Sequence, residues 1–155
     1  MRTRAVPDSV AMQRHFLPLL ASVHRQWRRL VDRKLQPLGL TEATWLPLLH
    51  LARSPAPMRQ IDLAASLFLD GSSVVRLLDA LEAAGLVERK EGADRRAKTI
   101  HLTASGKSTV KRIEKVVAQL RGGVLGQIPA QDLAHSHAVL QRIAAALSGA
   151  ERESA

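Results

Sequence analysis

The sequence contains no cysteine and no tyrosine, and aromatic residues make up only 3% of its 155 residues. Without cysteine, the chain cannot form a disulfide, a thiolate zinc site or a thiol redox switch. Proteins that bind single-stranded nucleic acid stack the bases on aromatic side chains, so the low aromatic content argues against that class. No apolar run approaches the roughly 18 residues of a membrane span, so we expect no membrane partner.

Patterns typical of secreted proteins, enzymes and metal proteins are also missing. The start, MRTRAVPDSV, carries charge without a following apolar segment, so we expect a cytoplasmic protein. There is no glycine-rich phosphate loop, nucleophile elbow or paired acidic site, which disfavours an enzyme, and we expect no cofactor. His135 and His137 form the closest histidine pair. Side chains at i and i+2 of a helix point apart, which disfavours a metal site and a metal-sensing regulator.

Positive charge is abundant. The chain has 23 Lys and Arg against 14 Asp and Glu, a formal net charge of +9. A balance this basic favours a polyanionic partner, with nucleic acid ahead of a membrane surface. A basic surface that only keeps the protein in solution is the alternative.

The periodicity of the apolar residues predicts a mostly helical chain. Apolar residues recur at helical spacing over residues 9–35, and the sequence Pro37-Leu38-Gly39 ends that helix. Thr41 is the expected N-cap of the next helix, in which Pro47 predicts a kink or a late start. The remaining predicted elements are helices over 59–66 and 72–84, a β-hairpin over 86–103, a helix capped by Thr103, and a last helix after Pro129.

A short helix, a turn, a second helix and a basic hairpin follow one another in the order of a winged helix-turn-helix. We therefore predict a mainly α fold with a small β-hairpin (α+β), in a single domain over residues 1–155. Residues 41–103 would form the winged helix-turn-helix lobe. The helices over 9–36 and 104–148 are more apolar than one small domain needs, which predicts a helical dimerisation region.

The predicted helix over residues 72–84 has an apolar side and a side suited to DNA. Val74, Leu77, Leu78 and Leu81 cluster on the first side. Ser72 and Arg76 lie on the second, flanked by Ser73 and Val75. Arg76 can bind a guanine edge or a phosphate, the hydroxyls can bind either, and Val75 can touch a thymine methyl. An ordinary amphipathic helix with a solvated outer face would show the same pattern.

In the hairpin tip, EGADRRAKTIHLT, the cations Arg95, Arg96 and Lys98 follow one aspartate, Asp94. Cations crowded in this way repel one another in the free protein, but an Arg in a narrow minor groove meets a strongly negative potential. A solvated charge run is the alternative. The excess is local, because between residues 88 and 112 the cations Arg89, Lys90, Arg95, Arg96, Lys98, Lys107, Lys111 and Arg112 outnumber Glu88, Glu91 and Asp94.

The run GSSVVRLLDALEAAGLVERKEGADRRAKTIHLTASG resembles the recognition helix and wing of MarR-type transcriptional regulators. Asp94-x-Arg96, followed by Leu102-Thr103 and Gly106, is similar to the wing signature of that family. The segments VRLLDALEAAGLVER, DRRAK and RLVDRKLQPLGLTEATW resemble its SlyA-like branch, and RGGVLGQI also fits. The resemblance spans about residues 20–147.

The resemblance implies a homodimer that binds a pseudo-palindromic operator in double-stranded DNA. Each recognition helix would enter a major groove and each wing a minor groove, with Arg96 as the groove residue and Asp94 as its support. The DNA-binding residues expected from pattern and resemblance together are Ser72, Ser73, Val75, Arg76, Arg89, Lys90, Asp94, Arg95, Arg96 and Lys98.

The resemblance also implies a small-molecule pocket near Arg25, Trp27 and Trp45, with His50 close by. An Arg beside indole rings suits a small aromatic or phenolic carboxylate, whose binding would relieve DNA binding through linkage. Core packing is an equally good account of Trp27 and Trp45, because both fall on apolar helix faces. Two further alternatives stay open: a regulator without an effector, and a DNA-binding architectural protein with little sequence preference.

Overall fold

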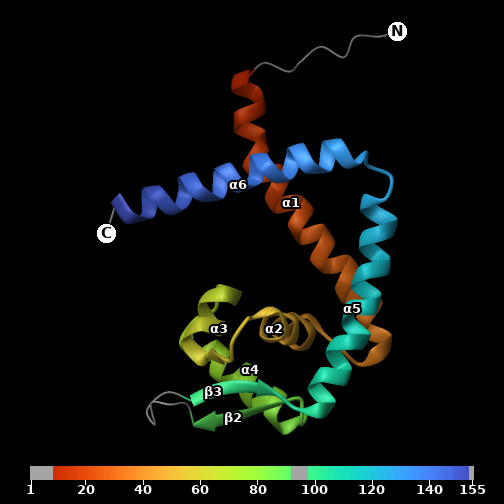
Figure 1. Cartoon of the computed structure of the whole chain (residues 1–155), viewed down its shortest axis with the longest axis vertical. Coiled ribbons are helices and arrows are strands. Elements are labelled where there is room, and N and C mark those ends of the chain that lie inside the picture. Colours follow the sequence, from red (N-terminus) through yellow and green to blue (C-terminus); the bar gives the residue numbers. More distant parts are fainter. Residues whose placement is uncertain (1–8, 92–97, 154–155) are drawn as a thin grey trace. The chain divides into compact units, whose positions relative to one another are not determined.

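A computed structural model of the chain describes residues 9–91 and 98–153 (Figure 1). The helices are α1 (Ser9–Leu35), α2 (Glu42–Arg53), α3 (Gln60–Leu67), α4 (Gly71–Ala83), α5 (Ala104–Leu125) and α6 (Ala130–Glu153), with a short 3-10 helix η1 (Gln36–Leu38). The strands are β1 (Met58–Arg59), β2 (Val87–Glu91) and β3 (Lys98–Leu102). The predicted fold class, mainly helical with a small antiparallel sheet, is confirmed.

The chain divides into two compact units, and the division falls inside α5. Unit 1 is Met1–Val117 and unit 2 is Ala118–Ala155. Across residues 9–91 and 98–153, none of the helices combines the length and the hydropathy needed to span a membrane.

Helix α1 has the predicted bounds, and its end follows from local chemistry. Gly39 adopts φ 73°, in the left-handed region that glycine reaches without strain, and its N–H donates to the carbonyl of Gln36 at 2.9 Å. Only the C-terminal part of α1 reaches the core, where Val31 and Leu35 are fully buried. The N-terminal part exposes a row of large apolar side chains: Val10, Met12, Phe16, Leu17, Leu19, Leu20 and Val23.

Helix α2 begins at Glu42, directly after the predicted cap Thr41, and runs through Pro47 to Arg53. The late start expected from Pro47 is therefore wrong. Proline removes one backbone donor from a helix, but Pro47 and its neighbours Leu48 and Leu49 are buried in the core of unit 1. Burial of apolar surface offsets the lost hydrogen bond.

The sheet has the strand order β1-β3-β2, and both pairings are antiparallel. The predicted hairpin is present, and its strands pair Val87 with Leu102 and Glu91 with Lys98. Strand β1 was not predicted, because two residues are too short to show an alternating pattern. Its Met58 pairs with Ile100, and this contact joins the segment before α3 to the centre of the sheet.

Unit 2 contains the end of α5 and the whole of α6. Gly122 and Gly123 do not interrupt α5, which continues to Leu125. Helix α6 begins at Ala130, immediately after Pro129, in agreement with the expected break. Unit 2 exposes large apolar side chains at the end of α5, in the segment before α6 and on α6: Val124, Leu125, Ile128 and Leu147.

Candidate nucleic-acid interface

The helix-turn-helix is formed by α3, a tight turn and α4. The turn depends on Phe68, which adopts φ 55° and whose N–H donates to the last carbonyls of α3. Leu69 closes the same turn by donating to the carbonyl of Ala64 at 3.0 Å. A side chain in the left-handed region costs free energy that glycine avoids. The Phe68 side chain is also 96% exposed, so its packing within this chain does not offset that cost.

Helix α4 begins one residue before the predicted start, because Asp70 is its N-cap. One carboxylate oxygen of Asp70 accepts from the backbone N–H of Ser73 at 2.9 Å and from the hydroxyl of Ser72 at 2.6 Å. The other accepts from the hydroxyl of Ser73 at 2.6 Å. These bonds, first from the Ser72 hydroxyl and then from Ser73, hold the pKa of Asp70 well below its usual range. The carboxylate therefore stays ionised and keeps the first turn closed.

This cap limits what the two serines can offer a partner. The hydroxyl protons of Ser72 and Ser73 are donated to Asp70, so the oxygens present free lone pairs rather than free protons. In this state the serines can accept hydrogen bonds from amino groups of adenine or cytosine. They cannot donate to a phosphate without breaking the cap.

The two sides of α4 differ as the sequence predicted. Val74, Leu78 and Leu81 are buried against the core of unit 1. Ser72, Val75 and Arg76 are exposed on the outer side. In the part of the chain that the structure describes, no hydrogen bond or ion pair of the Arg76 guanidinium is found, so it is available to an external acceptor.

Arg89 on β2 has a different environment from Arg76. Its guanidinium donates to Asp79 at 2.7 Å and to Glu82 at 2.8 Å, and both acceptors belong to α4. The side chain is only 19% exposed. The sequence did not reveal this pair of contacts, because residues seven and ten positions apart on different elements leave no periodic signal.

The remaining wing cations are more accessible. Lys90 and Lys98 are exposed, and Lys90 contacts only a neighbour on its own strand, Glu88, at 2.8 Å among the described ion pairs. The hydrogen bond from Lys90 lowers the pKa of Glu88, and the positive charges of Lys90, His101 and Lys107 lower it further. Asp94, Arg95 and Arg96 lie outside the described residues.

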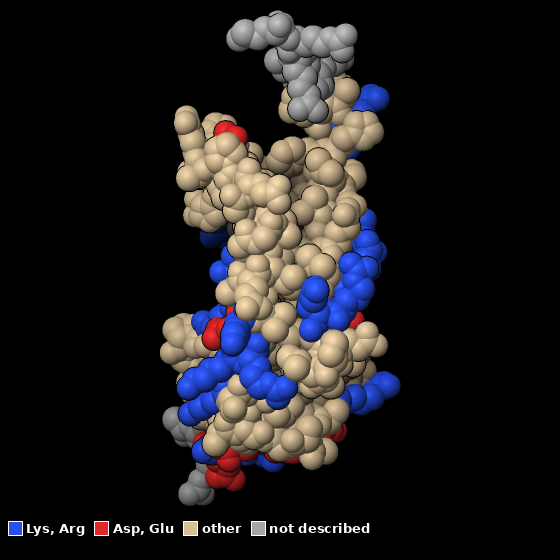
Figure 2. Space-filling model, turned by 90° about the vertical axis from the view of Figure 1, so that its right-hand side faces the viewer, with Lys and Arg blue, Asp and Glu red and all other residues tan. Residues whose placement is uncertain are grey.

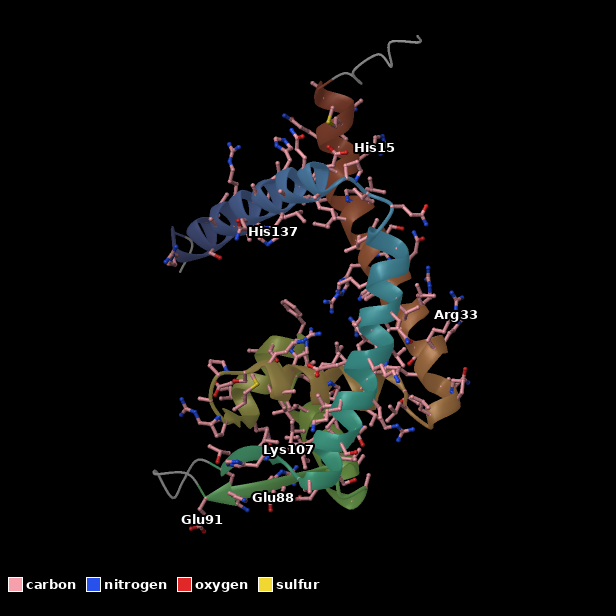
Figure 3. All side chains as sticks on the ribbon, turned by 45° about the vertical axis from the view of Figure 1, so that its right-hand side comes forward. His15, Arg33, Glu88, Glu91, Lys107 and His137 are labelled. Carbon is pink, nitrogen blue, oxygen red and sulfur yellow. The ribbon has the colours of Figure 1, made fainter. Side chains whose placement is uncertain are left out.

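Positive charge continues from the wing onto the first turns of α5. Figure 3 shows Lys107 near the start of α5 and Glu88 on the neighbouring strand β2. Lys107, Lys111 and Lys115 are exposed and follow one another at intervals of about one helical turn. On the face drawn in Figure 2, Lys and Arg side chains outnumber Asp and Glu.

The base of the wing is joined to the end of α4 by the segment Thr103 to Gly106. The hydroxyl of Thr103 donates to the carbonyl of Gly85 at 2.7 Å and accepts from the N–H of Gly106 at 3.0 Å. The backbone N–H of Thr103 donates to the carbonyl of Leu86 at 3.2 Å. Thr103 thus caps α5, as predicted, and also fixes that helix to the chain that leaves α4.

The residues expected near a ligand pocket lie in unlike environments. Trp45 is only 3% exposed, and its Nε1 donates to Oδ1 of Asp32 at 3.3 Å. Trp27 is half-buried and Arg25 is exposed. His50 is half-buried, and burial, followed by the charges of Arg53 and Arg28, lowers its pKa.

Arg28 is the polar residue between α1 and α2 that sequence reasoning missed. Its guanidinium forms an ion pair with Glu42, and its Nε is buried without a partner among the described residues. The helical pattern of α1 gave no sign of this contact, because Arg28 is one of several arginines in the same two turns.

A family model described as "MarR family" matches residues 38–97, which run from the end of η1 to the residue before β3. The crystal structure of the transcriptional regulator PA3341 is 44% identical to the chain, with a TM-score of 0.81. The match covers 86% of this chain and 98% of that one. The chain belongs to the MarR family.

Other solved structures place this MarR-family chain among winged-helix transcriptional regulators. AbsC, a MarR family regulator from Streptomyces coelicolor, is 28% identical with a TM-score of 0.73, over 96% of this chain and 99% of AbsC. MepR from S. aureus, in a complex with DNA, is 25% identical with a TM-score of 0.72, over 83% of this chain and 94% of MepR. The family and these neighbours are transcriptional regulators, not enzymes.

Proposed function

We propose that this protein is a sequence-specific regulator of transcription that binds double-stranded DNA as a homodimer. Helix α4 would enter the major groove and the wing between β2 and β3 the minor groove. The observation that carries the proposal is the exposed outer side of α4. There Ser72, Val75 and Arg76 face outward from a helix whose opposite side is buried. MepR, with the same fold, has been solved in complex with DNA.

Each exposed group has a chemical role in this proposal. Arg76 would bind a guanine edge, and Val75 would contact a thymine methyl. Ser72 and Ser73 would accept hydrogen bonds, because their protons are held by Asp70. Lys90 and Lys98 would contact phosphates. In the wing tip, outside the described residues, Arg96 would enter the minor groove with Arg95 beside it and Asp94 as its support.

The homodimer is supported by exposed apolar side chains in each unit. In unit 1 they line the N-terminal half of α1, and in unit 2 they lie on the end of α5 and on α6. Exposed apolar surface of this extent marks an interaction site. A second copy with two-fold symmetry would cover it and present two α4 helices to a pseudo-palindromic operator.

We also propose relief of DNA binding by a small aromatic carboxylate, as in the SlyA-like branch that the motifs RLVDRKLQPLGLTEATW and DRRAK resemble. Exposed Arg25 and half-buried Trp27 are available for such a ligand, with His50 in support. The indole N–H of Trp45 is already bonded to Asp32, so Trp45 would shape the site rather than donate to the ligand. A coupling of about 1–3 kcal/mol would weaken operator binding roughly 5–150-fold.

The test is fluorescence anisotropy with the DNA immediately upstream of the protein's own gene and with a shuffled duplex, at several salt concentrations. We expect a preference of about 10³ or more for the upstream DNA, in the range of specific binding. Salicylate should weaken that binding if the carboxylate proposal holds. Equal and steeply salt-dependent binding to both duplexes would instead mean either an operator at a distance from the gene or an architectural protein.

Arg76→Ala provides the residue-level test, with Arg142→Ala on the exposed surface of α6 as the control of equal charge. Loss of Arg76 should cost about 1–3 kcal/mol on the operator and change base preference. If Arg76→Ala lowers affinity equally on every sequence, Arg76 binds phosphate instead of a base.

A further inference from the structure

We propose that Arg89 is a positioning residue that holds the wing to the recognition helix, and not a direct DNA contact. The proposal rests on the proposed DNA-binding function and changes the role that the sequence suggested for this arginine. Its basis is that Arg89, although it lies in the cationic wing, points its charge into the protein.

The bonds of Arg89 extend along one side of α4. Nη1 donates to Glu82 at 2.8 Å, and Nη2 donates to Asp79 at 2.7 Å. Nη2 also lies 3.5 Å from the carbonyl of Val75. The backbone N–H of Arg89 donates to Glu82 at 3.2 Å. Glu82 therefore binds both the main chain and the side chain of Arg89. Positions 75, 79 and 82 lie on one side of a helix, and one guanidinium therefore spans two turns of α4.

This arrangement requires the geometry of arginine. A guanidinium is a planar fork that binds two carboxylates at once, whereas a lysine ammonium is a point charge on a flexible stem. Only 19% of the Arg89 side chain is exposed, against 59% for Asp79 and 42% for Glu82. The arginine also offsets one of the two negative charges that Asp79 and Glu82 place on α4.

Holding the two elements together matters because α4 and the wing are proposed to enter different grooves. A contact in the second groove adds its full affinity only if the first contact already places it correctly. Thr103 and Gly106 fix the base of the wing. Arg89 lies further along β2, toward the tip, and would fix the strand that carries the tip.

The test introduces Arg96→Ala, which removes the proposed wing-tip contact, into wild-type protein and into Arg89→Lys. Operator affinity is measured by fluorescence anisotropy in each case. Arg89→Lys keeps the charge and loses the fork. We expect Arg96→Ala to cost about tenfold in the wild type and less than about threefold in Arg89→Lys, because an unheld wing contributes little. If Arg89 and Arg96 contacted DNA independently, Arg96→Ala would lower operator affinity by the same factor in both backgrounds. That result would overturn the proposal.

Lys90→Met is the matched control on the same strand. Lys90 contacts Glu88 and has no described bond to α4. In this variant, Arg96→Ala should therefore lower operator affinity by the same factor as it does in the wild type. If Lys90→Met reduces that loss as strongly as Arg89→Lys does, the effect does not depend on the bonds between Arg89 and α4, and the proposal falls. If Arg96→Ala costs nothing in wild-type protein, there is no wing contact to position, and the proposal also falls.

Urea unfolding of each variant separates positioning from loss of the fold. Should Arg89→Lys be too unstable, Arg89→Met combined with Asp79→Asn and Glu82→Gln removes the clamp without leaving an unpaired charge, and the same reduction from tenfold to threefold is expected. Wild-type binding to operator and shuffled duplexes is measured first. If the two are bound alike, the proposed function fails and the role of Arg89 fails with it. If the operator is preferred, the role of Arg89 is decided by comparing how much Arg96→Ala lowers operator affinity in wild-type protein and in Arg89→Lys.

Discussion

Gly106 lies so close to Leu86 that a β-carbon added to the glycine would be 2.0 Å from the leucine carbonyl oxygen. That oxygen also accepts the N–H of Thr103 at 3.2 Å, so it cannot move away without breaking the bond. The glycine of the wing signature is therefore required by the close approach of α5 to the chain that leaves α4. Its own conformation is helical and does not require glycine.

Gly106→Ala should destabilise the protein by about 1–3 kcal/mol, because backbone atoms must shift to admit the methyl group. Gly122→Ala in the same helix is the control, since no atom lies within 4 Å of its added β-carbon. That change should stabilise the helix by about 0.5–1 kcal/mol. Urea unfolding at equal protein concentration measures both, and effects of the same sign would contradict this account.

Phe68→Gly should raise the free energy of unfolding by about 1 kcal/mol, because the left-handed conformation at φ 55° is strained for phenylalanine and not for glycine. The exposed ring loses no packing within this chain. Phe68→Ala removes the ring and keeps the strain, so it should leave stability nearly unchanged. If both substitutions are equally stabilising, the benefit comes from removing exposed apolar surface and not from the backbone.

Asp70→Asn should make the protein less stable than wild type at neutral pH, and the difference should narrow in acid. The folded pKa of Asp70 lies below its unfolded value, which is about 4. Such a group stabilises the fold above the unfolded pKa, and the contribution is lost as the pH falls through the folded pKa. Urea midpoints between about pH 7 and pH 2 test this. A difference that stays constant with pH would show that the charge of Asp70 does not matter.

Trp45→Phe should lower stability by about 2–3 kcal/mol, because it removes a buried hydrogen-bond donor to Asp32 and leaves a space in the core. Asp32→Asn keeps an acceptor for the indole and should cost less. Intrinsic fluorescence during urea unfolding reports the change through Trp27. A large loss of salicylate binding with unchanged stability would instead make Trp45 a ligand contact.

Much of the fold could be predicted from the sequence because its signals are local. The helical spacing of apolar residues along the 27 residues of α1 is set by residues near one another in the chain. The end of the helix before Gly39 is set in the same way. The hairpin and the cap of α5 at Thr103 are as well. The late start expected from Pro47 was wrong because burial of the helix around it is a tertiary effect. Strand β1 was missed because it exists only through its pairing with β3.

The candidate site was only partly predictable for the same reason. The exposed side of α4 follows from helical geometry, so Ser72, Val75 and Arg76 were found correctly on the surface. The partners of Arg89 lie on another element, and composition alone made that residue look like one more wing cation. The predicted helix began at residue 72, so Asp70 was not identified as the cap of α4, the role that its three bonds to Ser72 and Ser73 give it.

Different positions of α4 hold the helix in place and face outward, and this separation has a consequence for how the protein could be re-engineered or could diversify. Arg89 reaches position 75 through the backbone carbonyl, which every amino acid supplies, and the cap uses positions 70, 72 and 73. The side chains at positions 75 and 76 therefore carry none of the described bonds that hold the helix in place. A library randomised at these two codons should yield folded proteins at high frequency, each with its own operator preference, while the scaffold around them stays the same.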